Sequence, residues 1–322
     1  MRLSRVRNES KYLAIEYFSK EKDWSISWMC GILEISRASY YKWQHREQPE
    51  IEIENERIAA LIVEYDECFG HILGYRRMTL WINRINDTKY SKNRIHRIMQ
   101  AIGIHSVIRP KRYKYAKKSG TQISENVLKR DFFAERPNEK WSTDVTEFKV
   151  PGESGKIYLS AIMDLYDRSI IAFQLSGVNN NNLVFKTFDA AIKDNPGARP
   201  IFHSDRGFQY TSPVFVTMLS NAQMTQSMSR VGHCIDNGPT EGFWGIVKTE
   251  MYCLYDIQDR QSLIDGIKSY IHFYNYDRFQ ERFNGLAPME VREIAMRSDS
   301  PESYPIPVNK RVEEYKARYS AT

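Results

Sequence analysis

The stretch Ile201-Phe-His-Ser-Asp-Arg-Gly-Phe-Gln-Tyr210 places one carboxylate at the point where an apolar segment ends. Its apolar start is typical of a buried strand, Asp205 stands where the polar residues begin, and Gly207 frees the backbone of the next loop. In α/β sheets, ligands and catalytic groups collect at the carboxyl ends of strands. A lone aspartate after a strand is usually a loop residue, so its interpretation depends on partners elsewhere in the chain.

A second carboxylate lies upstream, on the first of three predicted strands. Residues 141–150 alternate as a strand with Asp144 on one face, and residues 151–155 form a turn. Apolar strands over 156–166 and 169–175 follow directly. Three strands in close succession predict an antiparallel meander.

A third carboxylate, Glu241, opens a predicted helix. Asn237 or Asp236 can cap this helix, and Pro239 suits its first turn. Lys248 follows Glu241 by seven residues, which is two helical turns, so both side chains lie on the same face. We expect Lys248 to contact a phosphate.

The three acids together suit one chemistry. Asp144 and Asp205 have 60 residues between them, and Asp205 and Glu241 have 35. Magnesium prefers oxygen ligands and retains waters. Three carboxylates can hold two such ions for phosphoryl transfer, in which water or a DNA 3′-hydroxyl attacks and no protein nucleophile is needed.

The spacing of Asp144, Asp205 and Glu241 resembles the D,D(35)E signature of the superfamily of retroviral integrases and transposases. The local sequences are closer to the second-frame (OrfB-type) transposases of the bacterial insertion-sequence-3 family. The central motif of that family matches His203–Ser212, with Phe208 where a serine is more usual.

Two further motifs agree in order. The segment Asp236–Lys248 resembles the third motif of the family, although Gly242 replaces a common serine. The C-terminal signature matches Tyr274–Arg278 and Gly285–Pro288, with Gln280 where histidine is typical. The several motifs cover most of the chain.

The resemblance implies a DNA transposase that cuts element ends with water and then uses the freed 3′-hydroxyl to attack another DNA phosphodiester. It implies two Mg²⁺ or Mn²⁺ ions, both held by Asp144, Asp205 and Glu241. The implied partners are double-stranded DNA (terminal repeats and target), further copies of the chain in a synaptic complex, and an upstream product joined by frameshifting.

The predicted fold class is α/β. A mixed five-stranded RNase H-like core is preceded by all-α domains of helix-turn-helix character. The predicted segments are an N-terminal helix-turn-helix-like part, a basic helical DNA-binding domain, a linker, the integrase core, and a C-terminal linker and tail. Their ranges are 1–50, 51–118, 119–137, 138–297 and 298–322.

The positive charge of the chain is concentrated in one segment. Residues 74–118 hold 13 Lys or Arg and a single acid, whereas the remaining residues carry a net negative charge although the whole chain is +6. Such a concentration is the electrostatic signature of nucleic-acid binding, because a solvated basic face would carry interspersed acids. The residues expected to contact DNA are Lys248, Arg206, Tyr210, Asn275 and Arg278 in the core, and Arg76, Arg77, Lys92, Arg94, Arg97, Arg109, Lys111, Arg112 and Lys114 in the basic segment.

The N-terminal half is predicted to be helical. Residues 27–43 suggest a helix, a tight turn and a second helix, with Ser27 and Ser36 as N-caps. An ordinary helical hairpin is the alternative, and the family resemblance favours DNA contact. Three more helices are predicted over 53–69, 74–84 and 91–103, with Ser91 as a cap and Gly103 as a stop.

Several classes of protein are excluded. No stretch is apolar for long enough to span a membrane, and the basic N-terminus has no apolar core behind it, as a signal peptide would. The four cysteines are far apart and form no C-x-x-C pair, which argues against zinc and against disulfides. We expect a cytoplasmic protein of bacteria, associated with the nucleoid when bound to DNA.

Other polar residues have commoner roles than catalysis. Asp164 and Asp167 suit a turn, and Asp236 suits a cap. Glu250 lies on the opposite side of its helix from Glu241. His203 suits packing or DNA contact. Two alternative functions remain, namely a regulator that binds element ends without cutting them and a nuclease acting on RNA–DNA hybrids.

Overall fold

The fold was analysed in a computed structural model, which describes residues 8–108, 131–229 and 237–305. The chain divides into two compact units, Met1–Ser106 and Val107–Thr322, and each is described by itself. No helix in these ranges is long and apolar enough to cross a membrane.

The first three helices are α1 (Glu9–Lys22), α2 (Ile26–Ile32) and α3 (Arg37–Gln44). Ser36 caps α3 as predicted, because its side chain accepts a hydrogen bond from the Ser39 amide. The predicted cap Ser27 is wrong, since α2 begins two residues earlier than expected, with Ser25 at the N-cap position, and leaves Ser27 inside the helix. The helices share a core whose buried members are Tyr12, Ile15, Met29, Cys30 and Tyr40.

The other three helices of this unit are α4 (Glu50–Cys68), α5 (Tyr75–Ile85) and α6 (Lys92–Ile102). The predicted ends of α6 are confirmed. Ser91 accepts a hydrogen bond from the Arg94 amide, and Gly103 ends the helix with φ of 75°, a conformation that glycine adopts without strain.

The second unit contains a five-stranded sheet in the order β3-β2-β1-β4-β5. Its strands are β1 (Lys140–Lys149), β2 (Lys156–Asp164), β3 (Ile170–Ser176), β4 (Ile201–Ser204) and β5 (Thr225–Met228). The first three are antiparallel, and β4 and β5 run parallel to β1. The predicted meander and mixed sheet are confirmed.

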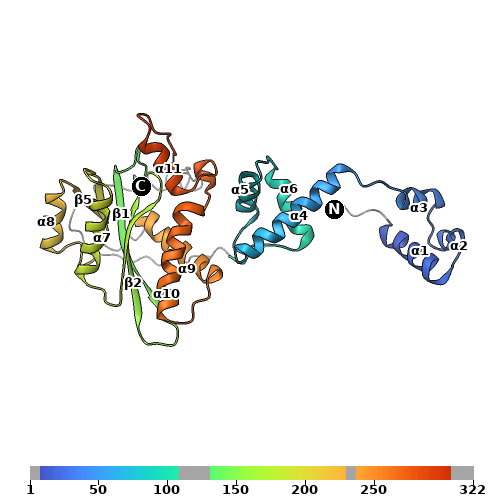
Figure 1. The fold of residues 1–322 in the computed structure, drawn as a ribbon, viewed down its shortest axis with the longest axis horizontal. Helices are drawn as coiled ribbons and strands as arrows, with labels where there is room; N and C mark the ends of the chain where they lie inside the picture. The colour runs from blue at the N-terminus through green and yellow to red at the C-terminus, as the bar shows by residue number, and fades with distance from the viewer. Residues whose placement is uncertain (1–7, 109–130, 230–236, 306–322) are drawn as a thin grey trace, which may run out of the picture. The chain divides into compact units, whose positions relative to one another are not determined.

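The helices of this unit are α7 (Asn181–Asp194), α8 (Pro213–Asn221), α9 (Gly238–Leu254), α10 (Arg260–His272) and α11 (Pro288–Met296). Figure 1 shows α7 and α8 on one side of the sheet and α9 and α10 on the other. A single π-helical turn, Phe273–Asp277, extends α10. The helix α11 was not predicted from the sequence.

The described ends of two stretches predicted as linkers, residues 131–137 and 298–305, contain residues that pack on the sheet unit. Ala134, at the end of the first linker, and Tyr304, in the second, are both buried against Tyr166 and Phe283. The Tyr166 hydroxyl also donates to the carbonyl of Glu302 at 2.8 Å. An aromatic side chain in a polar, proline-rich stretch was the signal that this stretch packs.

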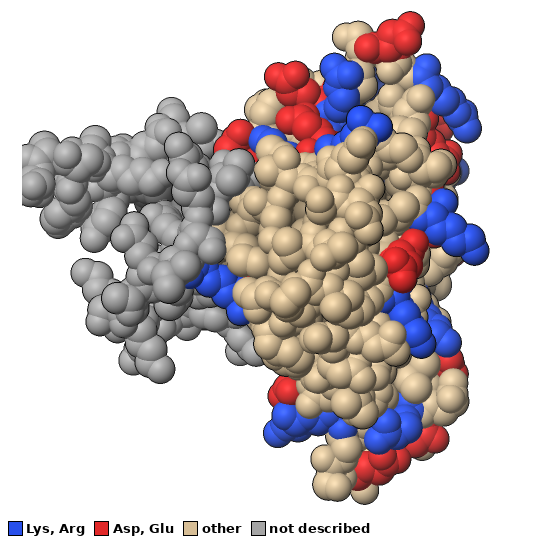
Figure 2. Space-filling view, turned by 90° about the vertical axis from the view of Figure 1, so that its left-hand side faces the viewer, with Lys and Arg blue, Asp and Glu red and all other residues tan. Residues whose placement is uncertain are grey.

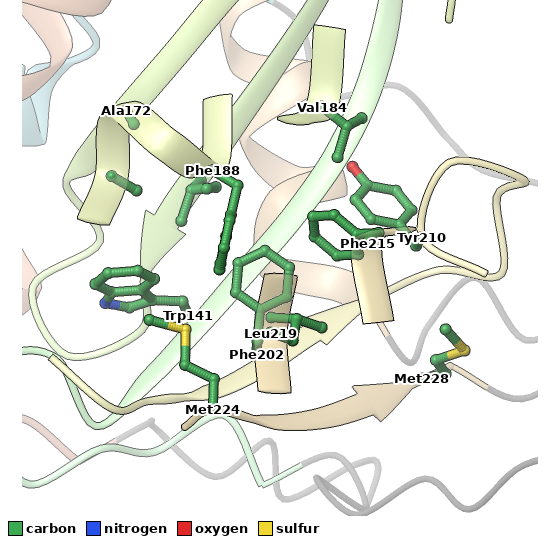
Figure 3. Packing of buried hydrophobic residues seen from close by; sticks show 12 residues of the cluster. Trp141, Ala172, Val184, Phe188, Phe202, Tyr210, Phe215, Leu219, Met224 and Met228 are labelled. Carbon is green, nitrogen blue, oxygen red and sulfur yellow. The ribbon is translucent and has the colours of Figure 1, made fainter. Parts of the chain in front are cut away.

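The main hydrophobic core lies between the sheet and the helices α7 and α8 (Figure 3). Phe188 from α7 meets Phe202 of β4 and Phe215 of α8, with both pairs of ring centroids 5.4 Å apart. Trp141 of β1 belongs to the same cluster. This packing fixes β1 beside β4.

The surface over α8 carries no charge. Residues 207–229 contain no Lys, Arg, Asp or Glu, and Val214 and Val216 of α8 are exposed. Figure 2, viewed from the side of α8, shows a broad uncharged area with charged side chains around its edge. This surface therefore provides no cation for a DNA phosphate.

Candidate active site

The register of the two central strands brings Asp144 and Asp205 together. In the parallel pair of β1 and β4, Ser142 lies opposite His203. Each aspartate comes two residues after its member of that pair, so the two lie at the same level of the sheet. Asp144 is within β1, and Asp205 directly follows the carboxyl end of β4. Neighbouring strands are about 4.8 Å apart. The predicted proximity of these two acids is therefore supported by the sheet topology.

The Asp144 carboxylate is held on both oxygens. Its Oδ1 accepts a hydrogen bond from the Val145 amide at 2.8 Å, and its Oδ2 accepts one from the Trp244 indole Nε1 at 3.0 Å. Burial, and then the charge of Asp205, raise the pKa of Asp144 to about 7, although the two hydrogen bonds act to lower it. Charge repulsion of this kind is relieved when a cation binds.

Asp205 begins the loop after β4, and Gly207 closes around it. The Gly207 amide donates to Asp205 Oδ1 at 2.9 Å. A Cβ at position 207 would approach Asp205 Oδ1 and Gln209 Oε1 to 3.0 Å each, so any larger residue would disturb the carboxylate. The glycine thus permits a close approach of the backbone to the Asp205 carboxylate.

Glu241 is placed by hydrogen bonds between the start of α9 and β1. Ser142 Oγ donates to Asn237 Oδ1 at 2.6 Å and lies 2.7 Å from Thr240 Oγ1. Asn237 Nδ2 donates to the Thr143 carbonyl at 3.1 Å. Asn237 therefore occupies the N-cap position of α9, but its side chain bonds to the neighbouring strand rather than capping the helix. Asp236, the alternative cap, lies outside the described residues.

The Glu241 residue is exposed, and its carboxylate is influenced by the charge of Asp205. Partial burial, and then the charge of Asp205, raise the pKa of Glu241 above its ordinary value. In the described part of the chain, no three His, Cys, Asp or Glu residues lie close enough together to hold one metal ion. Asp144, Asp205 and Glu241 thus influence one another by charge repulsion, but in the described residues they are not close enough together to share one ion.

Three residues predicted to contact DNA make contacts within the unit instead: Tyr210 and Asn275 are buried, and Arg278 is half-buried. Tyr210 is 1% exposed, and its hydroxyl lies 3.2 Å from Thr143 Oγ1. Asn275 pairs with the backbone of Ile170, accepting from its amide and donating to its carbonyl, both at 2.9 Å. These side chains hold the unit together.

Arg278, the third of them, forms an ion pair with the buried Glu250. Its Nε and Nη2 donate to the two oxygens of Glu250 at 3.0 and 2.9 Å, and the Tyr270 hydroxyl donates to the same carboxylate at 2.9 Å. Glu250, predicted to lie on the opposite side of its helix from Glu241, is therefore engaged with Arg278 and Tyr270. The ion pair fixes α9, which carries Glu241, against α10 and the π-helical turn.

Arg206 and His203, two further residues of the sheet unit, also make contacts within that unit. Arg206 Nε donates to the Ser229 carbonyl at 2.8 Å. His203 is buried, with Nδ1 2.9 Å from Ser227 Oγ and Nε2 3.2 Å from Ser229 Oγ, which confirms packing as its role.

The basic side chains of the first unit differ in their exposure to solvent. Arg76, Lys92 and Arg97 are exposed. Arg94 pairs with Glu54 at 2.6 Å, and Arg77 donates to the Ile72 carbonyl at 2.7 Å. Four further predicted DNA contacts lie outside the described residues, namely Arg109, Lys111, Arg112 and Lys114.

Lys248 lies on the exposed side of α9. Its Nζ is 5.3 Å from the centre of the Phe148 ring on β1. Partial burial lowers the pKa of Lys248, whereas the charges of Glu147 and Asp144 raise it. The charge of Lys248 is thus influenced by Asp144, an interaction that the shared helix face of Lys248 and Glu241 did not predict.

Asp164 and Asp167 form the turn after β2, as predicted, but they also bind an arginine that the sequence did not suggest. Arg292 Nη1 on α11 lies 2.8 Å from Asp164 Oδ2 and 3.0 Å from Asp167 Oδ2. Its Nη2 donates to Asn138 and Asn195. All three charged groups are buried, so α11 is tied to the sheet by this cluster.

Three residues of the site were missed in the sequence, namely Ser142, Asn237 as a strand contact, and Trp244. The signals were present. Trp244 follows Glu241 by three residues and so lies near it on the helix, and Ser142 alternates onto the face of Asp144. Neither pattern identifies its partner on another element.

Comparisons with known proteins agree with this organisation. Residues 134–234 and 241–296 match two family models described as "Integrase core domain", and residues 52–112 match one described as "HTH-like domain". The HTLV-2 integrase catalytic core domain, solved in complex with magnesium, has 17% identity and a TM-score of 0.37, and the match covers 49% of this chain and 97% of that chain.

The curated relatives are described as transposases or transposase-like. InsK of Escherichia coli K12, described as a transposase for insertion sequence element IS150, is 39% identical over 68% of this chain and 77% of its own length. A transposase-like protein of Haemophilus influenzae is 38% identical over 63% of this chain and 94% of its own length. InsF of E. coli K12, a transposase for insertion sequence IS3A, is 26% identical over 86% of this chain and 96% of its own length. The chain therefore belongs to the insertion-sequence-3 family of transposases and is a DNA transposase with an HTH-like domain and an integrase core.

Proposed function

We propose that this transposase cleaves and joins DNA with Asp144, Asp205 and Glu241 as its catalytic carboxylates, which hold two Mg²⁺ or Mn²⁺ ions. The observation that carries the proposal is the shared level of Asp144 and Asp205 on β1 and β4, with the Glu241 helix bonded to β1 beside them. The substrates would be the terminal repeats of an insertion sequence and a target duplex.

The donor set fits such ions. Carboxylate oxygens are the preferred ligands of hard divalent cations. The raised pKa values of Asp144 and Glu241 arise, after burial, from neighbouring acids, and a bound cation would offset that repulsion. When bound, two ions would activate the attacking oxygen and stabilise the leaving oxygen of an in-line displacement.

The side chains of the chain itself prepare the reaction. Hydrogen bonds to Asp144 and Asp205 fix both carboxylates, and the contacts of Ser142 with Asn237 and Thr240 hold the start of α9 on β1. Lys248 is placed to bind a DNA phosphate next to Asp144. Arg76, Lys92 and Arg97 are exposed for further phosphate contacts.

Cleavage should depend entirely on a divalent metal. Purified protein with DNA carrying the element ends is expected to produce nicked and joined products in Mn²⁺ or Mg²⁺ and none in EDTA. Gel analysis of labelled ends measures both products. Equal cleavage in EDTA would exclude the metal mechanism, and binding without cleavage in any metal would favour a regulator or a catalytic chain that needs its upstream fusion partner.

Replacing Lys248 with Ala should weaken DNA binding to the same extent for all sequences. The slope of the logarithm of affinity against the logarithm of salt concentration should fall by about one, the value of one phosphate contact. Exposed Lys268 on α10 provides the matched control, because its replacement removes the same charge from a neighbouring helix. Fluorescence anisotropy over a salt series measures both slopes. An unchanged slope for Lys248→Ala would contradict the phosphate contact.

The oligomeric state, the fusion partner and the location of this protein in the cell are proposed from its membership of the transposase family. Joining two ends needs two active sites, so we expect a homo-oligomer in a synaptic complex, a frameshift fusion with an upstream product, and action in the bacterial cytoplasm.

A further inference from the structure

The Trp244 indole links the two catalytic elements directly. It stands on α9, one helical turn after Glu241, and reaches across to the Asp144 carboxylate on β1. The Nε1–Oδ2 distance is 3.0 Å, and Trp244 is 7% exposed, so water competes little for the bond. A hydrogen bond to a charged group that is shielded from water is among the stronger ones in proteins.

The bond completes the orientation of Asp144. The Val145 amide holds Oδ1, but Val145 adjoins Asp144 in the strand and does not connect it to α9. The donor on Oδ2 comes from α9 itself. With one donor on each oxygen, the plane of the carboxylate is fixed relative to the helix that carries Glu241.

We propose that Trp244 is a positioning residue that orients Asp144 for metal binding. The inference rests on the proposed role of Asp144 as a metal ligand. Hydrogen-bond donors behind metal-binding carboxylates commonly change metal affinity by about 10- to 100-fold when they are removed. The aromatic body of Trp244 also packs against Phe243, with ring centroids 5.2 Å apart, so the packing contribution and the hydrogen bond must be separated.

Phenylalanine separates them, because it keeps an aromatic ring and lacks the N–H donor. Trp141→Phe is the matched control. Trp141 lies on the same strand as Asp144, is fully buried, and donates its indole N–H to Asn138 Oδ1 at 3.2 Å, a residue outside the catalytic group. Both variants lose one indole donor and some buried volume.

Mn²⁺ affinity is measured without DNA, by electron paramagnetic resonance of free Mn²⁺, in wild type, Trp244→Phe, Trp141→Phe and Asp144→Asn. Trp244→Phe is expected to weaken binding by about tenfold or more, with Trp141→Phe at the wild-type value. Wild-type affinity in Trp244→Phe would overturn the inference. Wild-type affinity in Asp144→Asn would instead show that Asp144 is not a metal ligand, which would overturn the proposed function and this inference together. The failure of the inference alone is therefore distinguishable from the failure of the proposed function.

Nuclear magnetic resonance tests the bond in the unaltered protein, in case a variant fails to fold. The chain has six tryptophans, and their indole N–H resonances are to be assigned in the wild-type protein itself, through contacts with assigned backbone resonances, so that no variant is needed. Mg²⁺ is expected to shift the Trp244 indole resonance and to leave that of Trp141 in place. A Trp244 resonance insensitive to saturating Mg²⁺ would overturn the inference.

Discussion

Glu241→Gln is expected to reduce strand transfer by about 1,000-fold or more. Glutamine keeps the shape of the side chain and removes its negative charge, so a ligand for the cation is weakened while the exposed position keeps the fold intact. Metal stabilisation of transition-state charge contributes several kcal/mol, and about 1.4 kcal/mol corresponds to a tenfold rate change. Quantitative gel assays with element-end DNA in Mn²⁺ measure the loss.

Glu293→Gln on α11 is the control, because it makes the same exchange at an exposed position of the same unit. DNA binding and the melting temperature should be unchanged in both variants. Strand transfer at the wild-type rate by Glu241→Gln would exclude Glu241 from the catalytic group. Loss of activity together with loss of DNA binding would instead point to a contact with DNA.

Arg292→Met is expected to destabilise the protein by about 3–5 kcal/mol, the range found when one partner of a buried ion pair is removed. Methionine retains much of the volume but leaves Asp164 and Asp167 buried without their shared cation. Urea unfolding followed by circular dichroism measures the free energy of unfolding. A variant as stable as wild type would contradict the structural importance of this cluster.

The stability lost in Arg292→Met should increase with pH. Burial, and then the charge of Asp164, raise the pKa of Asp167 from 3.8 to about 7, although Arg292 acts to lower it. An acid whose folded-state pKa is raised favours the folded state less as pH increases through that interval. Without Arg292 the charged form costs more, so Arg292→Met should lose more stability at pH 8 than at pH 5.5.

Arg297→Met is the control for this prediction, because Arg297 ends the same helix and is exposed. We expect it to change stability by less than about 0.5 kcal/mol. Adding Asp167→Asn to Arg292→Met should recover part of the loss, because one buried charge is removed. No recovery in the double variant would indicate that lost packing, rather than unpaired charge, causes the destabilisation.

The sequence by itself determined the main strands and helices of the integrase core and suggested the three acids that we propose as its catalytic carboxylates. Strands and helices with clear periodicity, such as β1 and α9, begin and end near their predicted residues because local pattern controls local structure. The neighbours of Asp205 along the chain include a glycine needed for close approach, and that too is a local requirement.

Only the tertiary structure decided which polar side chains serve the fold and which remain available. Tyr210 and Arg278 lie in motifs that suggested DNA contact, yet their polar atoms contact Thr143 and Glu250. Such pairings join residues far apart in the sequence, and no periodicity encodes them. For the same reason Trp244 became meaningful only once its indole was found at Asp144, since the distance between two elements depends on how the whole sheet and its helices pack.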